Sequence, residues 1–182
     1  MVITSGMEAG GHRASFLNLA EKSLSSTVDL IQKVKANIDI PIIAAGGIST
    51  GADIIKVLNQ GARAAQLGTV FLATEESNAS VEHKSMLLSQ KKIETKLTTV
   101  FTGRLARVID TDFVREVDKE GEIAPYPIQS AFLGPLRKAA KESNLLDYEA
   151  FWAGQPTSAI THKTTANLFK SLINEIELGG GI

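Results

Sequence analysis

The sequence lacks cysteine, an excess of charge of either sign, and any long apolar run. Without cysteine, disulfide bonds and thiolate metal sites are excluded. Lysine and arginine number 19 against 20 acidic residues, for a formal net charge of −1, so the composition gives no sign of a basic surface for nucleic acid or anionic lipid. No apolar run approaches the roughly 20 residues that span a bilayer. We therefore expect neither a nucleic-acid partner nor a membrane partner.

The first six residues are too short and too uncharged to form a signal peptide. Hydrophobic residues make up 43% of the 182 positions and charged residues 21%, which is ordinary for a globular protein. The length allows one good core, or one domain with a small appendage. A soluble cytoplasmic protein is the expectation from these totals.

Strands and helices alternate over about the first 73 residues. Apolar stretches at residues 1–4, 40–45 and 64–67 predict strands, and the second reads as a strand buried on both faces. Apolar residues recur at helical spacing between the first two strands, over residues 28–38. A second helix is predicted after Thr50, whose N-cap position and Asp53 three residues later resemble a capping box, with Gly61 at its C-terminal end. This alternation predicts an α/β fold with a parallel sheet or barrel.

The alternation ends near residue 73. A helix behind Ser77-Asn78, a strand at 96–101, helices near 111–119 and 128–142, and a final amphipathic helix are predicted further along. The expected division is therefore a barrel part at 1–73, a mostly helical inserted cap subdomain at 74–160, and a C-terminal helix at 161–182 that returns to the barrel.

Each of the three predicted strands is followed by a turn that contains glycine: Gly10-Gly11, Gly46-Gly47 and Gly68-Thr69. Strand ends in a parallel barrel point to one rim, where the last βα loops commonly bind phosphate. Glycine lets a backbone approach an anion, helix N-termini supply amide donors, and a threonine adds a hydroxyl. Glycine is also common in ordinary turns after strands, so a single pair of glycines does not identify a phosphate-binding site. The ordered series favours phosphate binding.

His12 is the one histidine in a loop of this kind, and its imidazole suits general-base catalysis near neutral pH. A lone histidine is more often structural, so this pattern alone leaves both roles open. Glu8, beside the same loop, either orients His12 or faces water. No residues have metal-ligand spacing, and no metal site is expected.

Six blocks of the sequence resemble the nitronate monooxygenase family, formerly called 2-nitropropane dioxygenases. They are Gly-Met-Glu-Ala-Gly-Gly-His-Arg at 6–13, Pro-Ile-Ile-Ala-Ala-Gly-Gly-Ile at 41–48, Gln-Leu-Gly-Thr-Val-Phe-Leu at 66–72, Phe-Thr-Gly-Arg-Leu-Ala-Arg at 101–107, Tyr-Pro-Ile-Gln at 126–129 and Trp-Ala-Gly-Gln at 152–155. The blocks occur in order and cover essentially the whole chain.

The resemblance implies an FMN-dependent enzyme on a TIM (β/α)8 barrel with an inserted cap subdomain. Such enzymes oxidise alkyl nitronates to carbonyl compounds and nitrite with O2, and some also accept neutral nitroalkanes. His12 matches the catalytic base of the family. The residues that match FMN contacts are Gly10, Gly47, Gln66, Leu67, Gly68 and Thr69, with Gly47, Gly68 and Thr69 nearest the phosphate.

The sequence departs from the family pattern at two positions and at its start. Ser5 stands where a flavin-contacting glutamine is usual, and Ala14 stands where a glycine usually follows His-Arg. Residues 1–4 match the sixth barrel strand, which implies a C-terminal half containing about the last three βα units. We expect such a piece to need the N-terminal barrel half as a partner, because three parallel strands leave unpaired edges and an uncovered apolar face.

Three alternatives stay open at this point. An FMN-dependent enoyl-acyl-carrier-protein reductase shares the barrel and a similar glycine–histidine loop. An NAD(P)H:quinone reductase is the second alternative, because membership of the family does not fix the electron donor. A truncated, inactive fragment is the third. The sequence leaves open the physiological substrate, the choice between oxygen and quinone, and the oligomeric state.

Overall fold

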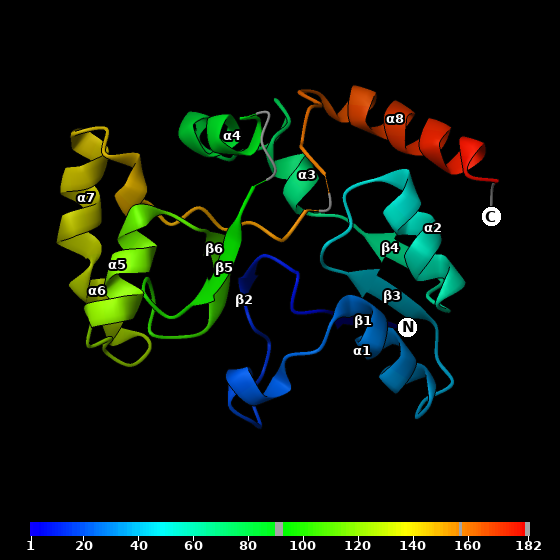
Figure 1. Cartoon of the computed structure of the whole chain (residues 1–182), viewed down its shortest axis with the longest axis horizontal. Coiled ribbons are helices and arrows are strands. Elements are labelled where there is room, and N and C mark those ends of the chain that lie inside the picture. The colour runs from blue at the N-terminus through cyan, green and yellow to red at the C-terminus, as the bar shows by residue number, and fades with distance from the viewer. Residues whose placement is uncertain (90–92, 157, 181–182) are drawn as a thin grey trace. The chain divides into compact units, whose positions relative to one another are not determined.

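The computed structural model describes residues 1–89, 93–156 and 158–180 of the chain. These residues form two compact units (Figure 1). The first unit comprises residues 1–9, 24–93 and 154–182, and the second comprises residues 10–23 and 94–153. The predicted division at residues 73 and 160 stays a prediction. Each unit has its own three-stranded sheet.

The first unit is built on a three-stranded parallel sheet. Its strands are β1 (Val2–Ser5), β3 (Ile42–Ala45) and β4 (Ala64–Gln66), in the order β1-β3-β4. Ala45 pairs with Ser5 on one side and with Gln66 on the other. The three strands therefore end level with one another, and the loops that follow them leave from one edge of the sheet.

Two helices cover one face of this sheet. They are α1 (Thr27–Lys35) and α2 (Gly51–Asn59). Ile31 of α1, Val57 of α2, and Ile42 and Ala44 of β3 belong to one buried cluster, in which Ile31 is 0% exposed. The alternate residues of β3 point to the other face, since side chains alternate along a strand. The strand within the apolar run at 40–45 is Ile42–Ala45, in which Ile42, Ala44 and Ala45 are buried.

The helix caps follow the local sequence. The Ser26 side chain accepts a hydrogen bond from the Asp29 amide at the start of α1. Thr50 accepts from the Asp53 amide, and the Asp53 carboxylate accepts in return from the amides of Ser49 and Thr50, at 2.9 and 3.0 Å. The predicted capping box is confirmed. Gly61 follows the C-cap with a φ of 106°, the left-handed conformation that glycine favours at this position.

Three further helices complete the first unit: α3 (Thr69–Leu72), α4 (Val81–Leu87) and α8 (Thr165–Leu178). The prediction that Ser77-Asn78 caps the helix at α4 was wrong, because Ser80 is the N-cap and Ser77 accepts instead from the Ala79 amide. α8 packs against α2, and the Glu175 carboxylate accepts from the Gly51 amide at 2.7 Å.

The second unit is built on an antiparallel sheet of β2 (Gly11–His12), β6 (Ala106–Ile109) and β5 (Thr95–Thr98), in that order. The other elements are the 3-10 helices η1 (Ala20–Ser23) and η2 (Leu146–Tyr148) and the helices α5 (Asp112–Glu120), α6 (Ile128–Phe132) and α7 (Gly134–Glu142). The predicted helix at 128–142 is thus two helices that meet at Leu133 and Gly134.

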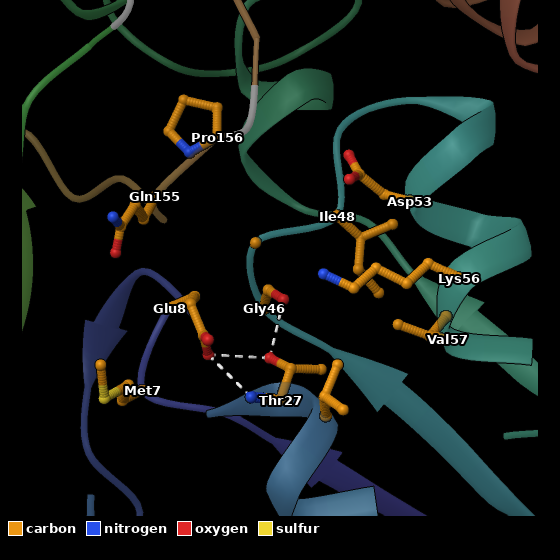
Figure 2. Close-up of a pocket in the computed structure, with 12 residues that line it drawn as sticks. Met7, Glu8, Thr27, Gly46, Ile48, Asp53, Lys56, Val57, Gln155 and Pro156 are labelled. Carbon is orange, nitrogen blue, oxygen red and sulfur yellow. Dashed lines mark hydrogen bonds between the residues drawn. The ribbon is translucent and has the colours of Figure 1, made fainter. Parts of the chain in front are cut away.

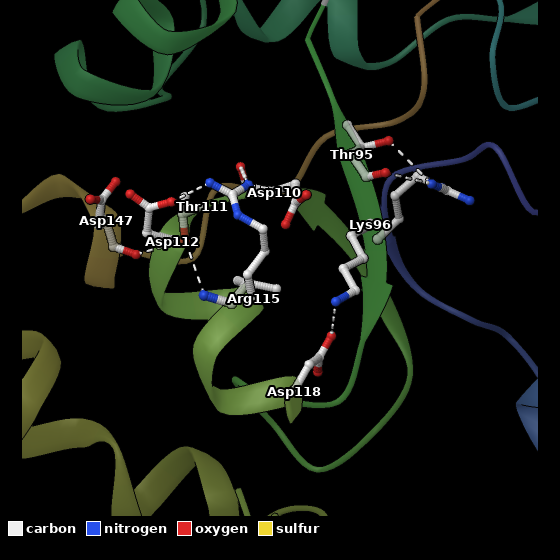
Figure 3. A network of polar contacts seen from close by, with 10 residues as sticks. Thr95, Lys96, Asp110, Thr111, Asp112, Arg115, Asp118 and Asp147 are labelled. Atoms are coloured by element: carbon white, nitrogen blue, oxygen red, sulfur yellow. Dashed lines mark hydrogen bonds and ion pairs between the residues drawn. The ribbon is translucent and has the colours of Figure 1, made fainter. Parts of the chain in front are cut away.

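Polar side chains join β5 to α5 in this unit (Figure 3). Lys96 lies 2.6 Å from the Asp118 carboxylate, and the Thr98 hydroxyl donates to the same carboxylate at 2.7 Å. Arg115 of α5 pairs with Asp110 and Asp112 at the start of its own helix. The short sheet is therefore fixed to its neighbouring helix by charge-assisted bonds as well as by apolar packing.

The α/β fold is confirmed. The sheet of the first unit is open, and among the described residues no strand closes it into a barrel. No helix in the described part of the chain has the length and apolar character needed to cross a membrane. The mostly helical subdomain predicted at 74–160 included a strand at 96–101, which the structure places at Thr95–Thr98 as β5. Strand β6 within that range was not predicted.

Substituting Asp53 with alanine should lower the free energy of unfolding by about 1 to 2 kcal/mol, because two backbone amides lose their acceptor. Asp29→Ala is the matched control, since Asp29 also lies in a first turn but its capping contact is made by its amide. It should lose less than about 0.5 kcal/mol. Urea unfolding of both variants measures the free energy of unfolding. An equal loss in Asp53→Ala and Asp29→Ala would contradict the capping role of the Asp53 carboxylate.

Candidate functional site

Five of the predicted cofactor-binding residues lie at the carboxyl edge of the parallel sheet. Gln66 ends β4, Leu67 packs on the apolar cluster, Gly68 is the N-cap of α3, and Thr69 opens that helix. Gly47 leaves the neighbouring strand β3 at the same level, since Ala45 pairs with Gln66. Parallel pairing therefore brings together two loops that are about 20 residues apart in the chain.

The glycines of these loops differ in what the protein itself requires. Gly46 and Gly47 have φ values of 106° and 71°, and a Cβ atom on them would lie 2.8 Å from the Ala9 nitrogen and 2.9 Å from the Glu8 Cβ, respectively. Chain geometry alone accounts for both. Gly68 has a φ of −123°, and a Cβ there would meet nothing within 4 Å. Neither conformation nor crowding within the chain requires glycine at position 68.

A later segment ties the edge loops together. The Gly154 amide donates to the Thr69 hydroxyl oxygen at 2.8 Å, and the Gln155 amide donates to the Glu8 carbonyl at 2.8 Å. Because Thr69 accepts the Gly154 hydrogen bond, its own hydroxyl proton is left to donate elsewhere. Gly154 and Gln155 therefore fix the loops after β1 and β4 relative to each other.

Glu8 caps α1 rather than orienting His12 or facing water. Its carboxylate accepts from the Thr27 amide and lies within hydrogen-bond reach of the Thr27 hydroxyl, both at 2.9 Å (Figure 2). The same hydroxyl lies 2.8 Å from the Gly46 carbonyl. A negative charge at a helix N-terminus is stabilised by the helix dipole. The Glu8–Thr27 pair thus links the loops after β1 and β3.

A cavity of about 290 Å³ lies beside these contacts in the first unit. Lys56 reaches into it from α2, and Glu8, Gly46 and Gly47 line it (Figure 2). Its other charged groups are carboxylates, so side-chain charge does not make this cavity a dedicated anion site. Gly47 is the one predicted cofactor-binding residue in its lining.

His12 belongs to the second unit, where it lies in β2 opposite Ala106 of β6. Its Nε2 atom is 2.9 Å from the Thr102 hydroxyl. The ring stacks at a tilt on Trp152, with centroids 5.1 Å apart, and forms a T-shaped contact with Tyr126, with centroids 6.3 Å apart. Trp152 is in turn bridged to Val108 of β6 and packs on the core of the unit. The imidazole is therefore held by one polar and two aromatic neighbours.

His12 is exposed overall, but partial desolvation of its ring lowers its pKa below the usual value of 6.5, and the nearby Arg104 guanidinium lowers it further. Both effects disfavour the imidazolium ion. The neutral ring, which can accept a proton, therefore predominates from a lower pH than in an unperturbed histidine. This direction suits a general base at neutral pH.

Sequence reasoning identified His12 but missed its neighbours. Thr102, Tyr126 and Trp152 each lie in a family-like block, yet nothing in their spacing indicated contact with a residue some 90 to 140 positions earlier.

Gly10, the remaining predicted cofactor contact, is exposed and belongs with His12 to the second unit. Its predicted role stays a prediction. Among the described residues, no group of three or more histidines and carboxylates is placed to hold a metal ion.

Comparison with known proteins gives a consistent result over nearly the whole chain. The sequence model of the family described as nitronate monooxygenase matches residues 1–176. A probable nitronate monooxygenase from Staphylococcus haemolyticus (strain JCSC1435) is 36% identical over 180 residues, which cover 97% of this chain and 50% of that protein. One from Staphylococcus aureus (strain Newman) is 37% identical, with 96% and 50% covered.

Two solved structures are similar in fold as well as sequence. Nitroalkane oxidase from Streptomyces ansochromogenes has a TM-score of 0.86 and 38% identity, covering 98% of this chain and 52% of its own. FabK from Thermotoga maritima has a TM-score of 0.73 and 31% identity, with 98% and 55% covered. The chain spans about half the length of the curated relatives that it matches.

Replacing Arg104 with glutamine should raise the pKa of His12, because one of the two influences that lower it is removed while burial remains. Lys119→Gln is the control, since it removes an exposed positive charge on α5 of the same unit. A pH titration of the His12 ring protons by NMR measures both. If the pKa of His12 in Arg104→Gln were unchanged or lower than in the unsubstituted protein, Arg104 would not be a cause of the lowered pKa.

Proposed function

The chain belongs to the nitronate monooxygenase family, and on that premise we propose that it is the flavin-phosphate-binding part of an FMN-dependent oxidoreductase. The proposed reaction is oxidation of an alkyl nitronate, or of a neutral nitroalkane after loss of its α-proton, to a carbonyl compound and nitrite with O2. The similarity of the described fold to nitroalkane oxidase from Streptomyces ansochromogenes supports this reaction class.

The observation that carries the proposal is the open space at Gly68. Gly68 follows β4 at the same sheet edge as Gly47, and its open Cβ direction leaves room there for a ligand to approach the backbone. The residues proposed to hold FMN are Gly10, Gly47, Gln66, Leu67, Gly68 and Thr69. Thr69 has a hydroxyl proton left to donate, and the first amides of a helix have no intrahelical acceptor, so the phosphate fits the donors of this edge.

FMN, when bound, supplies the electron-accepting ring for the oxidation. The protein's own contribution is the base. We propose that His12 removes the α-proton of a neutral nitroalkane, a step for which the lowered pKa keeps the imidazole unprotonated. A nitronate has already lost that proton, so its turnover depends less on the base.

The fold proposed for the complete enzyme is a TIM barrel to which the parallel strands β1, β3 and β4 contribute. Their order and register are those of consecutive parallel βα units. Both edge strands have an unpaired side among the described residues, and Ile3 of β1 is 54% exposed. Further strands supplied by an N-terminal barrel half would cover such edges.

A second candidate is reduction of a quinone or an enoyl thioester with NAD(P)H on the same scaffold. The similarity to FabK from Thermotoga maritima supports reduction as the second candidate reaction. Of the two solved structures, nitroalkane oxidase is closer in both identity and TM-score, which supports nitronate oxidation as the first candidate. Nitrite release from a nitronate, against NAD(P)H consumption with either acceptor, separates the two.

Gly68→Ala should weaken FMN binding by about tenfold or more while leaving stability within about 0.5 kcal/mol, because the added methyl group meets solvent in the free chain and the ligand in the complex. Gly134→Ala is the matched control, since its added Cβ also meets nothing within 4 Å and Gly134 opens α7, which does not follow a strand of the parallel sheet. Fluorescence titration with FMN and urea unfolding measure both properties. Equal FMN affinity in the two variants would contradict the proposed phosphate site.

His12→Asn should reduce nitrite release from a neutral nitroalkane by about 100-fold or more, the usual contribution of a positioned base. Release from the corresponding pre-formed nitronate should fall less. In the unsubstituted protein, the rate with the nitroalkane should fall as pH drops through a midpoint below 6.5, where the imidazole gains a proton.

His162→Gln is the control for this prediction, since His162 lies in the segment before α8 in the first unit. Unchanged turnover of the neutral nitroalkane by His12→Asn would remove His12 from the proposed mechanism without affecting the proposed FMN site.

A further inference from the structure

The hydroxyl group of Thr102 is shared by three neighbours. It lies 2.9 Å from Nε2 of His12, donates to the Arg104 carbonyl at 3.1 Å and accepts from the Arg104 amide at 3.2 Å. Thr102 is 9% exposed, so water competes little for these contacts. Its position is fixed by the turn after β5, in which the amides of Thr102 and Gly103 both donate to the Thr99 carbonyl.

A threonine hydroxyl carries one proton and two acceptor lone pairs. If the proton goes to the Arg104 carbonyl, the hydroxyl oxygen can accept from both the Arg104 amide and a protonated Nε2 of His12. All three contacts are then satisfied. If the proton went to Nε2 instead, the carbonyl would face a hydroxyl lone pair at 3.1 Å with no donor between them. The first arrangement is therefore favoured.

A protonated Nε2 in a neutral imidazole leaves the lone pair on Nδ1. Among the described residues, Nδ1 of His12 has no hydrogen-bond partner, whereas Nε2 has Thr102. The rings of Trp152 and Tyr126 hold the plane of the imidazole. The contact with Thr102 determines which of its two nitrogens faces the hydroxyl group.

We propose that Thr102 is a positioning residue that holds His12 in the Nε2-protonated tautomer, so that Nδ1 is the atom that takes the α-proton of a nitroalkane. In this step the carbon–hydrogen bond breaks, its electron pair stays on the substrate as the nitronate, and the proton bonds to Nδ1, giving an imidazolium whose Nε2 proton still donates to Thr102. The inference rests on the proposed function for the role of the base, and on the described contacts for the tautomer.

The tautomer is measured directly by a long-range proton–nitrogen correlation spectrum of the full-length 15N-labelled chain, at a pH where His12 is neutral. The chain has three histidines, and His12→Asn identifies the signals of His12 by their loss. We expect a protonated Nε2 and an unprotonated Nδ1. A protonated Nδ1, or an even mixture of tautomers, would overturn the proposal.

Thr102→Val keeps the shape of the side chain and removes the hydroxyl. It should shift His12 toward a tautomer mixture and lower turnover of a neutral nitroalkane by about tenfold, the equivalent of one hydrogen bond, with a smaller effect on a pre-formed nitronate. Thr102→Ser should restore both properties. Thr99→Val is the control, because Thr99 contributes its carbonyl to the same turn and its side chain is not required for the His12 contact.

The two proposals fail separately. A tautomer that is unchanged in Thr102→Val would overturn the role of Thr102 even in an active enzyme. An Nε2-protonated His12 that responds to Thr102→Val, in a protein whose nitroalkane turnover does not depend on His12, would leave the positioning contact intact and remove the proposed base.

Discussion

The parallel pairing of β3 with β1 and β4 determines where the loops of the first unit can act. Because Ala45 is level with both Ser5 and Gln66, the strands end together, and the segments that follow them emerge at one edge. Helices α1 and α2 also begin at that edge, but carboxylates of the chain already accept from their first amides: Glu8 at α1, and Asp53 and Glu175 at α2. The amide end left for an external anion is that of α3, after Gly68. A shift in the pairing of β3 with β4 would move Gly47 away from Gly68, and the two loops would no longer lie at the same level of the sheet edge.

Other contacts at this edge stabilise the loops rather than bind a ligand. Glu8 caps α1 through Thr27, while Gly154 and Gln155 hold the loops after β4 and β1. The chain itself explains the glycines at 46 and 47 through their positive φ values and close neighbours. Gly68 differs from these two because a Cβ atom there would meet nothing within 4 Å. The fold therefore requires glycine at 46 and 47, whereas the open space at 68 is compatible with the proposed ligand.

Local patterns predicted most of the first unit and less of the second. The capping box at Thr50 and Asp53 was predicted because its hydrogen bonds join residues three apart, and the strand of β3 because its apolar run is continuous. Strand β2 has two residues and gains its stability from β6, which lies more than 90 positions later, so no local pattern marks it. The neighbours of His12 were missed for the same reason. Thr102 and Trp152 reach the imidazole through tertiary contacts that spacing cannot encode.

The central claim is that the edge formed by Gly47, Gly68 and Thr69 receives the phosphate of FMN. Amide chemical shifts of the 15N-labelled chain, compared on addition of FMN and of riboflavin, test it most directly, because the two ligands share the flavin ring and differ in the phosphate. We predict that the amides of these three residues shift with FMN and shift much less with riboflavin at equal concentration. Equal responses to both ligands, or a response to FMN confined to other parts of the chain, would contradict the claim.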